Sequence, residues 1–256
     1  MPHINLCAVN NAQSQAMQNL TGYVRIEQFS SIAEIIQTYQ QLKAQHPTQA
    51  VLLILDDQNQ CDYTSWHCIE CLELAESEAE VDYADPNYPL HLLPAIRHLL
   101  QQTDIASQWA SMAEKTEHYS AADWKSFLAV NHNPLPTLKK SLLVRMADLP
   151  NTAEKLAITP NGYFTCDFNP FENYAIIESL TTEFGYEFLG LGAALLGFIK
   201  TERFSNDKAK EVIQRLKQIY PLPEDIAAQM QELIIQQDYL FLFYTESPED
   251  YLYFYS

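Results

Sequence analysis

The chain has 256 residues, 47% hydrophobic and 12% aromatic, a composition typical of folded globular proteins that excludes an intrinsically disordered chain. Its formal net charge of −18 at pH 7 would repel a phosphate backbone, which argues against nucleic-acid binding. The longest apolar stretch is too short to span a bilayer, and five cysteines, an odd number, fit a reducing compartment, so we expect a cytoplasmic protein that does not enter membranes.

The first 57 residues alternate between strand and helix patterns. Ile4–Val9 is a short apolar run, and Tyr23–Phe29 alternates between apolar and charged residues, which predicts a strand. Ser31 and Glu34 form a capping-box pattern at the start of a predicted helix. Val51–Leu55 is fully apolar and predicts a buried strand. This order of strand, helix and strand predicts a sheet with at least one parallel crossover.

A block of one charge sign follows these elements. Between Ala44 and Ile96 the sequence has no lysine or arginine but ten acids, and we call this stretch the acidic block. Its acids are Asp56, Asp57, Asp62, Glu70, Glu73, Glu76, Glu78, Glu80, Asp82 and Asp85. Such a block produces a long-range field that attracts cationic partners.

Residues 63–130 have mainly helical patterns, and within them Glu70, Glu73 and Glu76 fall on one helical stripe. The five glutamates Glu70, Glu73, Glu76, Glu78 and Glu80 are the predicted partner-binding residues, and we call them the acidic segment. Two interpretations are open. The segment is either a solvated face that keeps the chain soluble or a docking surface for a basic protein, a polyamine or a divalent ion.

Asp56 and Asp57 form the alternative candidate site, for a small ligand or a reaction. They follow the apolar strand Val51–Leu55, and open α/β sheets tend to place their binding sites at the carboxyl ends of strands. The competing interpretation is that two acids at this position stabilise a turn or the start of a helix.

Cys61, His67, Cys68 and Cys71 are the nearest approach to a metal-binding cluster. Cys68 and Cys71 would share a helical face, but no second pair of this spacing completes a site. We therefore predict no metal and no cofactor. No sequence motif of a common enzyme class is present, including the Gly-x-Ser-x-Gly and His-Glu-x-x-His patterns.

Residues 131–137 have the composition of a linker and predict a boundary between two sub-domains, 1–130 and 138–256. After it, the turn sequence Thr159–Gly162 predicts a hairpin that joins Leu156–Ile158 to Tyr163–Phe168. The predicted fold is α/β in the first half and α+β in the second, with mixed sheets and a helical middle segment.

The following residues predict a helix with strong end signals. Asn169 can cap it, with Pro170 at its first position and Glu172 at its third, and Gly185 can end it. Strands are predicted at Tyr186–Leu189 and Leu195–Lys200, and helices after Ser205 and Pro223.

The glycines at 190 and 192 do not complete a dinucleotide-binding pattern, since Leu195 takes the place of its third glycine. These two glycines predict a bulge or a close approach of two backbones instead.

The chain ends with two aromatic runs, Tyr239–Tyr244 and Tyr251–Tyr255, which predict a hairpin. The second run has three tyrosines on one face and would leave an edge on which a second copy of the chain could pair.

Two functional hypotheses remain. The first is a non-catalytic binding protein, like inhibitor or immunity proteins, that engages a cationic partner through the acidic segment. The second is an enzyme or small-ligand-binding domain with a site near Asp56 and Asp57 or in a cleft between the two halves.

Overall fold

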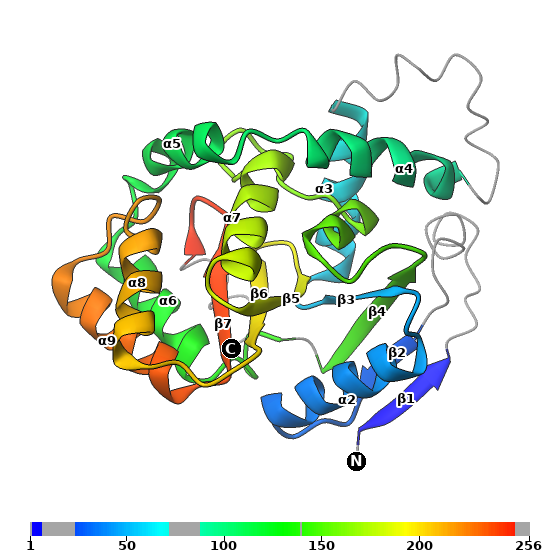
Figure 1. Ribbon diagram of the computed structural model, residues 1–256, viewed down its shortest axis with the longest axis horizontal. Coiled ribbons are helices and arrows are strands. Elements are labelled where there is room, and N and C mark those ends of the chain that lie inside the picture. The colour runs from blue at the N-terminus through cyan, green and yellow to red at the C-terminus, as the bar shows by residue number, and fades with distance from the viewer. Residues whose placement is uncertain (1, 7–23, 72–87, 139, 249–256) are drawn as a thin grey trace.

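The computed structural model describes residues 2–6, 24–71, 88–138 and 140–248 (Figure 1). Within these residues seven strands form one mixed sheet with helices packed around it, which confirms the predicted α/β class. None of the helices in this part of the chain has the length and hydropathy needed to cross a membrane.

The elements follow one another closely. The strands are β1 (His3–Leu6), β2 (Val24–Glu27), β3 (Ala50–Ile54), β4 (Ser141–Ala147), β5 (Tyr186–Leu191), β6 (Leu195–Lys200) and β7 (Tyr239–Phe243). The helices are α2 (Ile32–Gln45), α3 (Gln58–Cys71), α4 (Tyr88–Gln101), α5 (Ile105–Thr116), α6 (Ala121–His132), the 3-10 helix η2 (Ala153–Ile158), α7 (Pro170–Thr182), α8 (Asn206–Leu216) and α9 (Glu224–Gln236). The run of helices from α3 to α6 confirms the predicted helical middle segment.

The strand order across the sheet is β1-β2-β4-β3-β5-β6-β7. β3 and β5 are parallel neighbours, and the other neighbouring pairs are antiparallel. β2 and β3 both run antiparallel to β4, which lies between them, so the chain makes the predicted parallel crossover through α2. The sheet takes strands from both sides of residues 131–137, and the division into two sub-domains stays a prediction.

The central strand β3 is buried along its whole length, as its unbroken apolar sequence predicts. α2 packs on β3, and α7 packs on the adjacent strand β5. At the other end of the sheet, α6 covers β7 and α9 packs against α6 (Figure 1). This arrangement leaves the ends of β3 and β5, rather than their faces, as the places where polar side chains gather.

The residues predicted to cap helix ends do so in the structure. The Ser31 hydroxyl accepts a hydrogen bond from the Glu34 amide, and Asn169 forms a complete capping box with Glu172. Gly185, which follows α7, has a φ of 74°, a left-handed conformation that favours glycine.

The hairpin predicted around Thr159–Gly162 is wrong. Leu156–Ile158 belongs to the 3-10 helix η2, and Tyr163–Phe168 is a loop that no strand pairs with in the described chain. Gly162 has the left-handed φ of 114° that favours glycine, but the turn in this loop lies at residues 165–166. The flanking residues do not pair because side chains hold them elsewhere: Asn173 donates from Nδ2 to the carbonyl oxygens of Asn161 and Phe168, each at 3.0 Å.

Candidate functional site

Most of the predicted partner-binding residues lie outside the residues that the structure describes. Glu70 is in the last turn of α3, where only the backbone is described, and Glu73, Glu76, Glu78 and Glu80 lie outside the described residues. The run Tyr251–Tyr255, on which a second copy of the chain was predicted to pair, also lies outside the described residues. The pairing of copies through that run therefore stays a prediction.

Asp56 lies at the carboxyl end of β3, as predicted, but its carboxylate is enclosed. Only 1% of the residue is exposed. Its Oδ1 accepts a hydrogen bond from the Ala193 amide and its Oδ2 accepts one from the Ala194 amide at 3.2 Å. Burial raises the pKa of Asp56 to about 6, and the two amide hydrogen bonds oppose that rise.

The glycines at 190 and 192 give the close backbone approach that the sequence predicts. A Cβ at Gly192 would lie 2.1 Å from Cγ of Asp56, and one at Gly190 would lie 2.0 Å from the Leu53 carbonyl oxygen. The register of β5 against β6 shifts between Phe188 and Gly190, which is the predicted bulge. Asp56 and the loop after β5 are thus fitted to each other as one closed unit.

Asp57 caps the start of α3, and Cys61, Cys68 and Cys71 lie along that helix. Oδ1 of Asp57 accepts a hydrogen bond from the Gln60 amide at 3.0 Å, which is helix-capping chemistry. Cys61 is buried, and Nδ2 of Asn161 lies 3.3 Å from its Sγ. Cys68 is buried too, whereas the side chain of Cys71 is not described. No three His, Cys, Asp or Glu side chains in the described ranges are gathered to hold a metal ion.

An arginine from outside the acidic block forms an ion pair with one of its acids. Arg145 of β4 is completely buried, and its Nη2 donates to Oδ1 of Asp62 at 2.5 Å. Its Nη1 donates to the Thr159 hydroxyl at 2.7 Å. Because a buried guanidinium needs a counter-charge, Asp62 has a structural role at the α3 surface.

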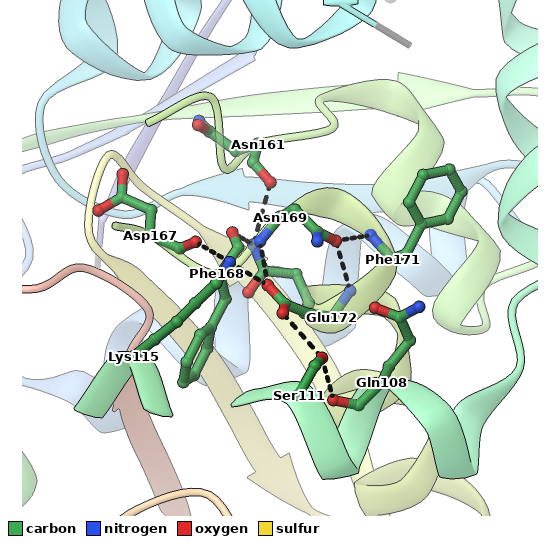
Figure 2. A network of polar contacts seen from close by, with 10 residues as sticks. Gln108, Ser111, Lys115, Asn161, Asp167, Phe168, Asn169, Phe171 and Glu172 are labelled. Atoms are coloured by element: carbon green, nitrogen blue, oxygen red, sulfur yellow. Dashed lines mark hydrogen bonds and ion pairs between the residues drawn. The ribbon is translucent and has the colours of Figure 1, made fainter. Parts of the chain in front are cut away.

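A second polar cluster holds the start of α7 against α5. The carboxylate of Glu172 accepts hydrogen bonds from Nζ of Lys115 at 2.6 Å, from the Ser111 hydroxyl at 3.0 Å and from the Asn169 amide at 2.7 Å. Figure 2 shows these donors converging on Glu172 from α5 and from the capping residue of its own helix. Glu172 is 2% exposed and all of these contacts are internal, so the cluster joins elements of the fold.

Asp167 adds a buried carboxyl group to the same loop. Lys115 donates to its backbone carbonyl oxygen at 2.6 Å, as Figure 2 shows, while the side chain of Asp167 points elsewhere. The pKa of Asp167 is raised to about 7, mainly by burial. The hydrogen bond from the Glu246 amide opposes the rise, and the negative charge of Glu246 adds to it.

A pocket of about 450 Å³ opens at the amino end of β5, between α2, residues 151–154 and α7. Beneath it lies Lys155, fully buried, whose Nζ donates to the Tyr39 hydroxyl at 2.8 Å, to the Val51 carbonyl oxygen at 2.9 Å and to Oδ1 of Asn151 at 3.0 Å. Burial lowers the pKa of Lys155 to about 7, which the charge of Glu187 opposes. The three acceptors match the three protons of the ammonium group, so Lys155 ties α2, β3 and η2 together.

The pocket wall brings together residues from both sides of the predicted boundary. Lys43 of α2 forms an ion pair with Glu187 of β5, and the Tyr39 hydroxyl donates to the same carboxylate at 2.5 Å. The remaining wall comes from residues 151–201. A site in a cleft between the two halves stays a prediction, because the structure does not test the boundary between them.

Arg145, Lys155 and the pocket carboxylates are absent from the sequence predictions. A single charge inside an apolar run is a signal that could have identified Arg145. After its first residue, a serine, the strand otherwise contains only Leu, Val, Met and Ala. Nothing comparable marks the pocket, whose residues come from four separate segments.

Comparison of the chain with protein-family models, with curated proteins and with solved structures gave no match.

Proposed function

We propose that this chain is a non-catalytic binding protein, similar in role to inhibitor or immunity proteins, that engages a cationic partner through the acidic segment. We place it in the cytoplasm. The described cysteines Cys61 and Cys166 are free thiols, which is compatible with a reducing compartment.

The observation that carries the proposal is the distribution of ion pairs. Several lysines and arginines of the described residues pair with acids that lie outside the acidic block, while Arg145 pairs with Asp62 inside it. The pairs with acids outside the block are Lys43–Glu187, Arg97–Glu154, Lys115–Glu172, Lys208–Glu202, Arg215–Glu183 and Lys217–Glu224. These basic residues therefore neutralise other acids, which supports an excess of negative charge on the acidic segment.

The use of Asp56 and Asp57 also favours a binding role over catalysis at that place. Both oxygens of Asp56 accept backbone hydrogen bonds, and Asp57 caps α3. A carboxylate that reacts needs access to its substrate, and Asp56 has 1% of its surface exposed.

The test is partner capture with matched charge variants. A variant with Glu70, Glu73 and Glu76 changed to Gln should lose most of the capture of a basic partner from lysate of the source cells, since electrostatic steering and contact both weaken. A control variant carries Glu114→Gln, Glu117→Gln and Glu211→Gln, three exposed acids outside the block, and should retain capture. Equal capture by all three proteins contradicts the proposal.

The small-ligand hypothesis remains as the second candidate because of the pocket at the amino end of β5. The described residues that line that pocket do not belong to the acidic segment, and their chemistry points to a ligand class of its own.

A further inference from the structure

The pocket beside β5 is lined by three carboxylates and one ammonium group. Glu154, Glu178 and Glu187 supply the carboxylates, and Lys43 supplies the ammonium group. Tyr174 and Tyr186 add aromatic rings to the wall. A cavity of about 450 Å³ lies within the range of sites that hold small molecules.

Two of the three carboxylates already have cationic partners. Glu187 pairs with Lys43, and Glu154 accepts hydrogen bonds from Nε of Arg97 at 2.5 Å and from Nε2 of Gln101 at 2.9 Å. Glu178 has no such partner: within the described residues no lysine or arginine forms an ion pair with it. It is half-buried, and burial raises its pKa, with the charge of Glu154 adding to the rise.

Tyr186 provides an independent observation in the same wall. The residue is 2% exposed, and its buried hydroxyl has no hydrogen-bond partner in the described part of the chain. Leaving such a group unsatisfied is costly, and buried polar groups in native structures nearly always have a partner. A ligand group in the pocket would supply one.

The pocket wall sets a carboxylate beside an aromatic ring. Glu178 lies one helical turn from Tyr174 on the same face of α7, so a cation held by the carboxylate also meets an aromatic ring. Glu154, Glu178 and Glu187, all within the described residues, do not form a group that could hold a metal ion. An organic ammonium ion with an aliphatic stem fits both the charge and the aromatic walls.

We propose that this pocket binds a linear aliphatic diamine: one ammonium group pairs with Glu178, the stem lies against Tyr174, and the second ammonium group donates to the Tyr186 hydroxyl. The ligand is a small molecule. The proposal uses no residue of the acidic segment, so it stands or fails separately from the proposed function.

The experiment is isothermal titration calorimetry of the full chain with cadaverine as the probe and with pentanediol as its neutral analogue. Wild type should bind cadaverine but not pentanediol. Glu178→Gln should weaken cadaverine binding at least tenfold, because a charge-assisted hydrogen bond is lost. Glu211→Gln, which removes an equal charge from the exposed face of α8, should leave the affinity within twofold of wild type.

Two further variants test whether cadaverine binds in this pocket. Tyr186→Phe should weaken binding severalfold because a ligand ammonium group loses its acceptor, and an unchanged affinity would contradict the proposed contact. Thermal melting should show that each variant stays folded. The variant with Glu70, Glu73 and Glu76 changed to Gln should bind cadaverine as wild type does. No binding to wild type, or equal affinities for wild type and Glu178→Gln, would overturn the proposal. Loss of binding in the acidic-segment variant would overturn it as well.

Discussion

The two ends of the parallel strands β3 and β5 contrast in how their polar groups are satisfied. At the carboxyl end, Asp56 is closed in by the backbone of residues 192–194 and both its oxygens are used. At the amino end, the pocket leaves the Glu178 carboxylate without a cation and the Tyr186 hydroxyl without a partner in the described chain. The comparison teaches that the position of a carboxylate near a strand end does not by itself indicate a site, because its hydrogen-bonding capacity can be used within the fold, as that of Asp56 is.

The first prediction tests the close packing at the carboxyl end of β3 and β5, where Asp56 is enclosed. Gly190→Ala would place a Cβ 2.0 Å from the Leu53 carbonyl oxygen, in the backbone of the neighbouring strand. Since that strand cannot move without losing its pairing, we expect more than about 3 kcal/mol of destabilisation. Gly197→Ala, whose Cβ meets side-chain atoms of Leu55 at 2.8 Å, should cost less. Denaturant unfolding of both variants measures the difference, and an equal cost would contradict the geometry.

The second prediction removes the enclosed carboxylate itself. Asp56→Ala leaves the amides of Ala193 and Ala194 without their acceptor, which should cost about 2–4 kcal/mol of unfolding free energy. Asp56→Asn retains one acceptor oxygen and should cost less, as denaturant unfolding of both variants can show. Neither variant should change cadaverine affinity if it stays folded, and a change would link the two ends of the strands.

A third prediction compares two glutamates on the same helix. Glu172→Gln weakens hydrogen bonds from Lys115, Ser111 and the Asn169 amide, and we expect a loss of about 2 kcal/mol. Glu178→Gln removes a carboxylate that has no cationic partner in the described chain and should change stability by less than about 0.5 kcal/mol. Thermal and denaturant unfolding decide between them. A large loss for Glu178→Gln would show that its charge is already used.

The fourth prediction concerns pH. The pKa of Asp167 in the folded protein is raised to about 7 from its ordinary value, so the folded state binds this proton more tightly than the unfolded state does. The stability that the protonated Asp167 carboxyl group contributes is fully present below the pKa of this residue in the unfolded chain. It is lost as the pH rises through about 7, the pKa in the folded protein. The Asn side chain of Asp167→Asn does not ionise, so this variant should become more stable relative to wild type as the pH rises from about 4 to about 8, by about 1–3 kcal/mol. Parallel pH profiles of unfolding free energy for both proteins would contradict this assignment.

The local elements of the fold were predictable from the sequence because their signals are local. The capping box of Asn169 and Glu172, the left-handed Gly185 and the apolar run of β3 each depend on a few neighbouring residues. The hairpin at Thr159–Gly162 failed because its flanking residues are held by side chains from distant segments, which a turn pattern does not report.

The site was less predictable for a related reason. The position of Asp56 at a strand end followed from the sequence, but its enclosure depends on Gly192, 136 positions later. The pocket is assembled from α2, residues 151–154, α7 and β5, and no segment alone has a pattern that marks it. The field of the acidic segment stays a prediction, which the sequence supports because charge adds over distance whatever the fold.

The most direct test of the proposed function is the salt dependence of partner affinity. Once a partner is captured, its dissociation constant is measured by titration over a range of salt concentrations for wild type, the acidic-segment variant and the matched control. We expect affinity to fall steeply with salt for wild type and control, and only weakly for the acidic-segment variant. An affinity that does not respond to salt, or that responds equally in all three proteins, would contradict a cationic partner bound by the acidic segment.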